Sequence, residues 1–461
     1  MSDPTLVATA WMDEAWDDAA GLLWNPPGAF ADITDGPHTV HLVRETAWYA
    51  IGLLRRAHPG DRVRAERALA SVIDQQYDAP RRPWHGTFVR FPEWPAPQQG
   101  AVEWVDYDPN WRQFVGTALA VAVTDFDLTR ALAERARAAV ALAVDAEPPD
   151  RVPPTYANIA LLRAWLEAWV GRADRTFARS VAAAFHARGC FTEHNSPTYY
   201  GIDLLALGLW QRADAPRELR QLGEGIEQAL WADLARWWHA GLGNLCGPYS
   251  RAYGMDLHAY VSGLGLALWC AELPAPLPDL TASPVAHGHD LCVAPMLQHG
   301  GVRVPALVRH AFEAFEGPHA VTQLVDDHPR RVATGWVDHD LLLGAEADDG
   351  GPQARGQRHP ATIHWRLPGG DVGWLRLVHH GPTTATAAPR QLDVICRPHP
   401  RHGPRPLRWE SNVAPILVTS DRWELPGLEV LVATNARLHD PRHLAFEPPR
   451  DGHVRMRLTI R

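Results

Sequence analysis

The stretch Leu273-Pro-Ala-Pro-Leu-Pro-Asp-Leu-Thr-Ala-Ser-Pro284 separates two parts of the chain that differ in their hydrophobic pattern. Proline has no backbone N–H and a fixed φ angle, so a run this rich in proline interrupts both helices and sheets. We interpret residues 275–284 as a linker. The sequence therefore predicts one domain on each side of it.

Residues 1–274 have the pattern of a series of helices. Apolar residues recur there at three- and four-residue spacing, and short Pro/Gly breaks separate the segments. Besides an N-terminal segment, the expected helices are Val43–Ala57, Val63–Gln76, Trp111–Val123, Leu128–Val144, Tyr156–Val170, Arg175–Ala187, Ile202–Gln211, Arg217–His239 and Met255–Cys270. They show no repeat of fixed length, which disfavours a regular solenoid.

Residues 285–461 instead contain short runs in which apolar and polar residues alternate. The clearest are Ala361–Leu367, Val372–Val378, Gln391–Cys396, Ala414–Thr419, Leu428–Thr434 and His453–Ile460. A period of two, with Gly, Pro and Asp between the runs, predicts an antiparallel β-sandwich domain. The expected fold class is therefore α+β multidomain, with the helical domain first.

The charged residues exclude several kinds of chemistry. The chain has 461 residues and no lysine, so all 44 of its cationic side chains are arginine. A Schiff-base lysine, a pyridoxal phosphate anchor and the Gly-Lys-Ser/Thr phosphate loop all need the missing amine. The net charge of −9 argues against a nucleic-acid partner, although a local arginine cluster could still attract an anionic substrate.

The cysteines and the N-terminus favour a cytoplasmic protein. The five cysteines are widely spaced and form no CxxC pair, which is typical of neither a disulfide framework nor a zinc ribbon. The first residues lack the basic start and unbroken apolar core of a signal peptide. A membrane span would need a charge-free apolar run of about 20 residues, and the sequence contains none, so we expect no membrane partner.

Two turn-like segments hold most of the candidate catalytic side chains. The first, Gly189–Gly201, reads Gly-Cys-Phe-Thr-Glu-His-Asn-Ser-Pro-Thr-Tyr-Tyr-Gly, and the second, Gly247–Asp256, reads Gly-Pro-Tyr-Ser-Arg-Ala-Tyr-Gly-Met-Asp. An imidazole titrates near neutral pH, so His194 with Tyr199 or Tyr200 forms a candidate acid/base pair. Arg251 offers a fixed fork for a carboxylate, although an ion pair with Asp256 or Glu193 would explain it equally well. The candidate substrate contacts in these segments are Glu193, Asn195, Tyr253 and Asp256.

Further polar residues stand near the beginnings of predicted helices. Asn110, Trp111 and Arg112 open one helix, where the indole suits sugar stacking, although Asp108 or Asn110 could simply cap the helix. Asn158 lies in a helical turn among apolar neighbours and needs a partner if it is buried. The remaining candidate binding residues are Arg44, Glu45 and His85, at positions where helix pairs of a ring would open onto a groove.

One tract carries side chains of the kind that bind metals. It reads His287-Gly-His289-Asp290. Among 24 histidines a local pair is a weak signal, so we expect no metal and no cofactor.

These motifs resemble those of a family of polysaccharide lyases. Gly189-Cys-Phe-Thr-Glu-His194 with Tyr199-Tyr-Gly201 is similar to the Gly-Ser-Phe-x-x-His…Tyr-x-Gly signature of chondroitin AC and hyaluronate lyases, and more loosely to heparinase II/III-like proteins. Asn110-Trp111 resembles their Asn-Trp motif, and Thr155-Tyr-Ala-Asn158 their Thr-Gly-Ala-Asn segment. Arg251 stands about where their catalytic arginine would. The resemblance implies an incomplete (α/α) toroid followed by an antiparallel β-sandwich.

The resemblance also implies a reaction, β-elimination across a uronate. Asn158, helped by an arginine, would neutralise the substrate carboxylate and so acidify the neighbouring C–H. Tyr199 or Tyr200 would move the proton, with His194 as its partner base, and Arg251 would lower the pKa of the tyrosine. The partner would then be an oligosaccharide or small-molecule substrate.

Other functions fit the same residues. A glycoside hydrolase on an (α/α) toroid would use paired carboxylates, such as Asp108 with Asp256 or Glu193. A cytoplasmic cyclase, dehydratase or isomerase would use an apolar cavity rich in tryptophan, of which the chain has 20. A carbohydrate-binding protein without activity would use tryptophans as platforms, although Trp165 and Trp169 lie on apolar helix faces where a core role is expected.

Overall fold

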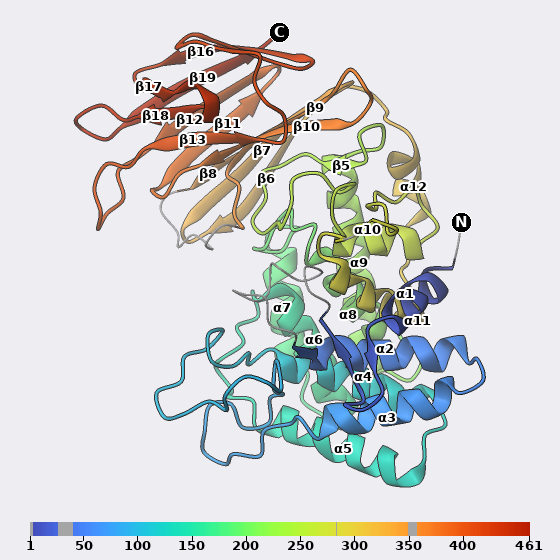
Figure 1. Ribbon diagram of the computed structural model, residues 1–461. Helices are drawn as coiled ribbons and strands as arrows, with labels where there is room; N and C mark the ends of the chain where they lie inside the picture. Colours follow the sequence, from blue (N-terminus) through green and yellow to red (C-terminus); the bar gives the residue numbers. More distant parts are fainter. Residues whose placement is uncertain (1–2, 26–39, 283, 349–356) are drawn as a thin grey trace. The chain divides into compact units, whose positions relative to one another are not determined.

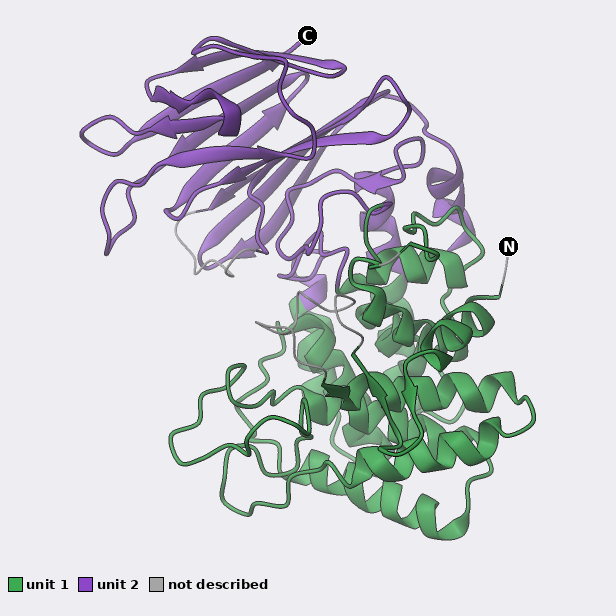
Figure 2. Cartoon of the chain, viewed as in Figure 1, with its two compact units in different colours: residues 1–184, 199–227, 259–303 green, residues 185–198, 228–258, 304–461 purple. Residues whose placement is uncertain are grey.

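The structure is a computed structural model that describes residues 3–25, 40–282, 284–348 and 357–461 (Figure 1). Helices predominate in the N-terminal part and antiparallel strands in the C-terminal part, so the fold is mixed α and β as the sequence predicts. The chain forms two compact units (Figure 2). Unit 1 comprises residues 1–184, 199–227 and 259–303, and unit 2 comprises residues 185–198, 228–258 and 304–461. The division falls inside α7 (Thr176–His186) and α9 (Arg217–Trp237).

Unit 1 consists mainly of helices. In its described part these are α1 (Pro4–Asp13), α2 (Val43–Arg56), α3 (Asp61–Ile73), α4 (Trp111–Asp125), α5 (Arg130–Asp145), α6 (Ala157–Trp169), α8 (Tyr200–Trp210), α10 (Gly263–Cys270), the 3-10 helix η1 (Gly288–Val293) and α11 (Ala294–Gly300), together with residues 176–184 of α7 and 217–227 of α9. A small sheet of β1 (Trp16–Asp17), β2 (Leu22–Trp24) and β3 (His41–Leu42) precedes α2.

The helices of unit 1 differ in how much of their surface is buried. In α4 every residue from Trp111 to Ala122 is buried, and α8 is buried along its whole length. In α5, by contrast, the buried residues Leu132, Ala136, Ala139 and Ala143 follow a three- or four-residue spacing along one side. A helix that is apolar all round belongs inside a domain, whereas an amphipathic helix covers it.

The packing agrees with this distinction. Helices α2, α4, α6 and α8 pack on one another in succession, while α3 packs on α2 and α5 packs on α4. We call α2, α4, α6 and α8 the inner helices. Each helix predicted between residues 43 and 239 is present, with ends that differ by a few residues.

One predicted helix is wrong in its first half. The segment Met255–Cys270 is helical only from Gly263, because the Ser262 side chain accepts a hydrogen bond from the Gly265 N–H at 3.0 Å and so caps the helix there. Residues 255–262 instead belong to the loop that carries the second polar turn.

Unit 2 is built on a large antiparallel sheet of 14 strands within the described residues. Its first strands are β6 (His319–Asp327), β7 (Arg330–Asp338), β8 (Leu341–Asp348), β9 (Ala361–Arg366), β10 (Val372–Val378), β11 (Thr383–Ala388) and β12 (Gln391–Cys396). The others are β13 (Leu407–Ser411), β14 (Leu417–Val418), β15 (Arg422–Leu425), β16 (Leu428–Thr434), β17 (Arg437–Asp440), β18 (Ala445–Glu447) and β19 (Val454–Ile460). The unit also contains β4 (Trp238–His239), β5 (Asn244–Leu245), α12 (Ala306–Glu313) and the 3-10 helix η2 (Pro441–His443).

The sheet curls so that distant strands face each other. Its main path runs β14-β15-β16-β19-β12-β11-β8-β9-β10-β13-β18-β17, and β7 pairs with β8 and β6 beside this path. Trp409 of β13 and Trp423 of β15 are far apart along the path, yet their ring centres are 6.1 Å apart. Trp365 of β9 donates from Nε1 to the Pro426 carbonyl, next to β15, at 2.8 Å. These contacts enclose one apolar core between the two halves of the sheet.

The region after residue 285 does not begin with strands. The helices η1, α11 and α12 occupy much of residues 288–313, and the first strand of the large sheet begins at His319.

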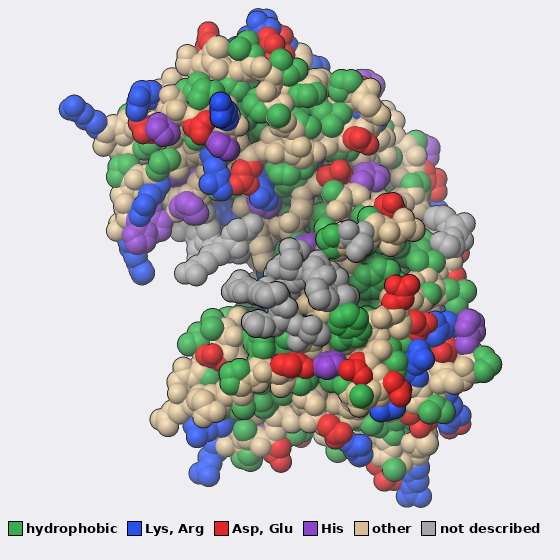
Figure 3. Space-filling model, in the orientation of Figure 1, with side chains coloured by type: hydrophobic (Ala, Val, Ile, Leu, Met, Phe, Trp, Pro, Cys, Tyr) green, Lys and Arg blue, Asp and Glu red, His purple; other side chains and the backbone are tan. Residues whose placement is uncertain are grey.

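Acidic and basic side chains are interspersed over the face of the molecule that Figure 3 shows. None of the helices in the described ranges combines the length and apolar character that a membrane span needs.

Candidate functional site

The inner helices of unit 1 are parallel, so their N-terminal ends gather on one side. At that side the Asn110 amide, just before α4, bonds the Tyr156 hydroxyl, just before α6, at 2.8 Å. At the opposite side, Trp169 of α6 bonds Thr124 of α4 at 2.8 Å. There Asp125, the last residue of α4, also accepts hydrogen bonds from Arg212, which follows α8, and from His299.

The first turn of α2 belongs to the same side. The Cζ atom of Arg44 lies 5.6 Å from the ring centre of Trp111, the first residue of α4. At the other end of α2, Arg55 bonds His299 at 3.1 Å. We call the side where α2, α4, α6 and α8 begin the polar end of unit 1. It gathers the predicted residues Arg44, Glu45, Asn110, Trp111, Arg112, Asn158, Tyr199 and Tyr200.

Arg44 and Glu45 form a buried ion pair at the polar end. Their Nη2 and Oε1 atoms are 2.5 Å apart, and Glu45 is 2% exposed. The Arg44 guanidinium lies over the rings of Trp48 and Trp111. Trp111 itself is 3% exposed, so a sugar could reach its ring only after a rearrangement.

Several polar residues here hold the helix ends together. Arg151 donates to the Asn110 Oδ1 at 2.8 Å and to the Glu147 Oε2 at 2.8 Å, and the amide of Gln113 also donates to Glu147. Asn110 therefore joins α4 to α6 and to the segment before it.

Arg112 and His85 act within one loop. The guanidinium of Arg112 donates to the carbonyls of Pro83, His85 and Pro109. The His85 Nδ1 accepts from the Ala79 N–H at 3.1 Å. In this structure both side chains organise the loop before α4.

Asp108 lies in the same region and is half-buried. Burial raises the pKa of its carboxyl, while the N–H of Asn110 and the charges of Arg90, Arg44 and Arg151 act in the opposite direction. A carboxyl group with a raised pKa is suited to donate a proton near neutral pH.

Asn158 is buried in the first turn of α6. It is 1% exposed, and neither its Oδ1 nor its Nδ2 has a hydrogen-bond partner among the described residues. A buried amide without partners costs about 1–3 kcal/mol. Such a group is a candidate to bind a ligand that offers both a donor and an acceptor.

Tyr199 and Tyr200 begin α8 and differ in accessibility. Tyr199 is half-buried, whereas Tyr200 is 0% exposed. The next residue, Gly201, packs on the start of α10, where a Cβ atom would lie 2.3 Å from the Gly263 carbonyl oxygen. Glycine at 201 is therefore required for the close approach of these two helix ends.

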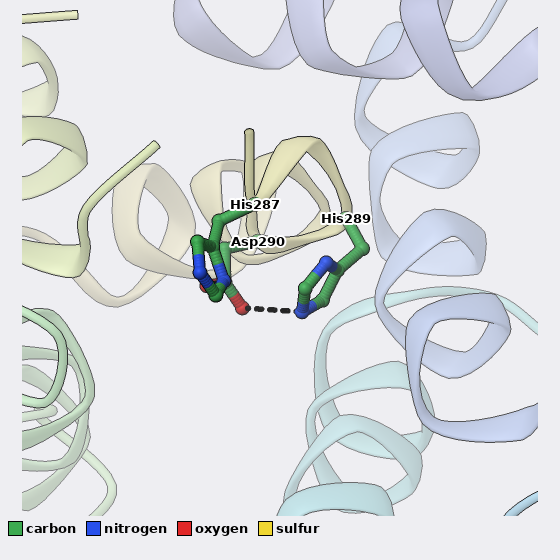
Figure 4. Close-up of side chains that lie close together, drawn as sticks. All are labelled: His287, His289 and Asp290. Atoms are coloured by element: carbon green, nitrogen blue, oxygen red, sulfur yellow. Dashed lines mark ion pairs between the residues drawn. The ribbon is translucent and has the colours of Figure 1, made fainter. Parts of the chain in front are cut away.

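The tract with metal-binding side chains that the sequence analysis named lies at the start of η1 in unit 1. The side chains of His287, His289 and Asp290 face one another (Figure 4). The His289 Nε2 is 3.5 Å from the Asp290 Oδ1, and η1 packs on α2. The only signal in the sequence was the pattern His-x-His-Asp after the proline-rich stretch.

In unit 2 the structure brings the two predicted polar turns together. The Arg251 Nη1 donates to the Glu193 Oε1 at 2.9 Å, and its Nε donates to the Gln357 Oε1 at 3.0 Å. The Ser196 hydroxyl donates to the Arg251 carbonyl at 2.8 Å, and the Tyr253 N–H to the Thr198 hydroxyl at 3.3 Å. Of the two partners considered for Arg251, Glu193 is thus the one that the structure shows.

His194 is buried beside a carboxylate in unit 2. Its Nε2 is 3.2 Å from the Asp233 Oδ2, within ion-pair distance but without the geometry of a hydrogen bond. The rings of His194 and Trp237 meet edge to face at 5.1 Å. Asp233 was missed, although an acidic residue on the same face of α9 as the buried Leu230 and Trp237 is a usable signal.

Asn195 and Asp256 stabilise the loops that contain them. The Asn195 amide donates to the Cys246 carbonyl at 2.9 Å, and the Asp256 Oδ1 accepts from the Asn244 amide and the His258 N–H. Asn195 has a φ of 48°, a left-handed conformation that asparagine tolerates better than most residues.

A buried charge network anchors both turns to the sheet. Arg331 of β7 donates to the Thr192 carbonyl at 3.0 Å, to the Ser250 hydroxyl at 2.9 Å and to Glu346 of β8 at 2.8 Å. Arg358 also pairs with Glu346. The sequence reasoning missed this network, because its members stand in strands that carry no motif.

Comparison with known proteins places the chain in a family. Residues 6–299 match the family described as a domain of unknown function (DUF8769). The chain belongs to this family. The DUF8769 region contains all the predicted site residues, from Arg44 to Asp256, and also the cluster on η1. The matched region ends at residue 299, before the first strand of the large sheet begins at His319. No curated protein matches the chain.

Proposed function

We propose that this protein is a carbohydrate-active lyase that cleaves a uronate-containing saccharide by β-elimination. The observation that carries the proposal is the buried Asn158, whose donor and acceptor both lack partners among the described residues. A uronate offers a carboxylate that accepts from the amide N–H and a neighbouring hydroxyl that donates to the amide oxygen. Binding to this ligand would satisfy both atoms.

The polar end of unit 1 is suited to an anionic sugar. The N-terminal ends of four helices lie at that side, so their positive dipole ends point toward it. Charge at this end favours a carboxylate, and it also favours the enolate that forms when the neighbouring proton leaves.

The fold supports the same proposal. Inner helices that pack in succession, with outer helices against them, are what an incomplete (α/α) toroid requires. The curled sheet agrees with an antiparallel β-sandwich domain. We propose the toroid for residues 1–274 and the sandwich for residues 285–461, as the resemblance to the polysaccharide lyases implies.

Tyr199 is the better candidate for the catalytic tyrosine, because it is half-buried while Tyr200 is inaccessible. In the proposed reaction the Tyr199 phenolate removes the proton from the carbon next to the carboxylate. The electron pair of that C–H bond forms a carbon–carbon double bond, the glycosidic C–O bond breaks, and the leaving oxygen receives the proton that Tyr199 removed, which restores the phenolate.

The analysis of reaction products tests this proposal. The protein is incubated with a panel of uronate-containing oligosaccharides, and ultraviolet absorbance and product masses are recorded. Elimination creates an absorbing double bond, and the product masses add up to the mass of the substrate. Products that together contain one additional water, without the new absorbance, would show hydrolysis instead. Intact substrates throughout the panel would favour the carbohydrate-binding alternative.

One observation favours glycoside hydrolysis as a second candidate. Burial raises the pKa of the Asp108 carboxyl, which is the direction of shift that a general acid needs. The same product analysis decides between the two reactions.

We also propose a cytoplasmic location. All five cysteines are free thiols, which is typical of a reducing compartment. Cell fractionation tests this location.

A further inference from the structure

Three potential ligand atoms converge on η1 of unit 1. One atom each from His287, His289 and Asp290 lie within 4.8 Å of one another. The His289 Nε2 is 3.5 Å from the Asp290 Oδ1, and the His287 Nδ1 is 4.0 Å from the Asp290 Oδ2. In Figure 4 the His289 ring faces the Asp290 carboxylate across the ion pair, and the His287 ring overlaps Asp290 in this view.

The backbone of η1 brings these side chains together at a cost. His287 has a φ of 52°, in the left-handed region that residues other than glycine seldom adopt. Strain of this kind is concentrated at functional sites. The conformation places His287 beside Asp290, three residues later in the chain.

The chemistry of the three groups fits a divalent transition metal. Zinc binds imidazole nitrogen and carboxylate oxygen at about 2.0–2.2 Å, so two ligands of one tetrahedral ion lie roughly 3.4 Å apart. The observed separations, 3.5 Å to the Oδ1 and 4.0 Å to the Oδ2 of Asp290 and up to 4.8 Å among the three ligand atoms, require the side chains to close in around the ion.

The cluster lies in a largely buried position, where the His289 side chain is 5% and the Asp290 side chain 21% exposed. Among the described residues, the ion pairs of Asp290 are with His287 and His289 alone. Arg44 of α2, the helix on which η1 packs, is itself paired with Glu45.

We propose that His287, His289 and Asp290 bind a zinc-like divalent cation. Three protein ligands leave a fourth position for water or an oxygen of a ligand, which is the arrangement of a catalytic rather than a structural zinc site. The site does not depend on the lyase reaction, because its primary readout is metal content.

Metal analysis of the full-length, untagged protein tests the site. The protein is dialysed against Zn²⁺, freed of unbound metal and measured by mass spectrometry for zinc, with Co²⁺ absorbance as a second probe. We expect one Zn²⁺ per chain and the intense visible bands of tetrahedral Co²⁺. His289→Ala and Asp290→Asn should weaken Zn²⁺ binding by more than the roughly 10–100-fold that outer-sphere changes cost.

His58→Ala is the matched control, since His58 is an exposed histidine of the same unit. It should bind Zn²⁺ as the wild type does. Circular dichroism shows whether each variant folds; should His289→Ala misfold, the conservative Asp290→Asn decides the matter. Wild-type protein that binds no Zn²⁺, or the same Zn²⁺ affinity in Asp290→Asn and the wild type, would overturn the proposal.

Discussion

The Asn110 amide donates a hydrogen bond to the Tyr156 hydroxyl at 2.8 Å, and this bond joins the N-terminal ends of α4 and α6. Removing the hydroxyl with Tyr156→Phe should lower the free energy of unfolding by about 1 kcal/mol. Urea-induced unfolding measures the change. The control is Tyr77→Phe, since burial is the cause that raises the pKa of Tyr77 to about 12 and its hydroxyl has no hydrogen bond within the part of the chain that the structure describes. Equal effects of the two substitutions would mean that the Asn110–Tyr156 bond adds nothing.

The two tyrosines at the start of α8 should differ in function. Tyr199→Phe removes the proposed base and should lower kcat by about 10²–10⁴-fold, the usual contribution of general acid–base catalysis. Tyr200→Phe changes a side chain that is 0% exposed, so this variant should show a far smaller decrease in kcat. Steady-state kinetics on the cleaved oligosaccharide separates the two. The assignment fails if Tyr200→Phe is the variant that loses activity.

The far end of the inner helices should show a pH-dependent stability. Burial opposes ionisation of Asp125, but hydrogen bonds from His299 and Arg212 outweigh it and lower the pKa of this carboxyl below its ordinary value of 3.8. A lowered folded-state pKa means that the carboxylate stabilises the folded chain above about pH 4 and stops doing so as the pH falls further.

The Tm difference between wild type and Asp125→Asn should therefore be largest near pH 6 and shrink toward about pH 3. Thermal melts across this range test it. Asp127→Asn, at a side chain that is 93% exposed, is the control and should show little difference at any pH. A Tm difference between the wild type and Asp125→Asn that grows as the pH falls would contradict the stabilising role of the Asp125 carboxylate.

The charge network of unit 2 should matter for stability. Glu346 is 2% exposed and is paired with Arg331 and Arg358. Glu346→Ala therefore leaves two largely buried guanidinium groups without their carboxylate partner. We expect a loss of about 3–5 kcal/mol in the free energy of unfolding. Glu313→Ala breaks an exposed pair with Arg309 and should cost about 0.5 kcal/mol or less. Similar losses in both variants would refute the role of the network.

Much of the fold could be predicted from hydrophobic periodicity. Strands β9, β10, β12, β16 and β19 lie where alternation is strong. Strand β8 escaped notice because Leu341–Glu346 are all buried, and a strand buried on both faces does not alternate. Of the run Ala414–Thr419 only Leu417–Val418 forms a strand, and Ile416 in that run is 70% exposed. The alternation of apolar and polar residues in this run therefore does not mark a strand with one buried face.

The candidate site could be predicted in part. Local motifs identified the two polar turns, and the structure shows that Glu193 and Arg251 meet. Local motifs could not reveal Arg331 or Glu346, because these residues reach the turns through sheet packing at large sequence separations. The same limit applied to Tyr156, whose partner Asn110 lies 46 residues earlier.

The central claim is that the buried Asn158 amide binds a ligand and does not hold the fold together. The most direct test compares the free energy of unfolding of the wild type and Asn158→Leu, with saccharide cleavage measured on the same samples. Since an unpartnered buried amide costs about 1–3 kcal/mol, leucine of similar size should leave the protein equally stable or stabilise it by up to that amount, while cleavage is lost. A variant that loses about 1 kcal/mol or more of stability, or one that still cleaves the substrate at the wild-type rate, would contradict the claim.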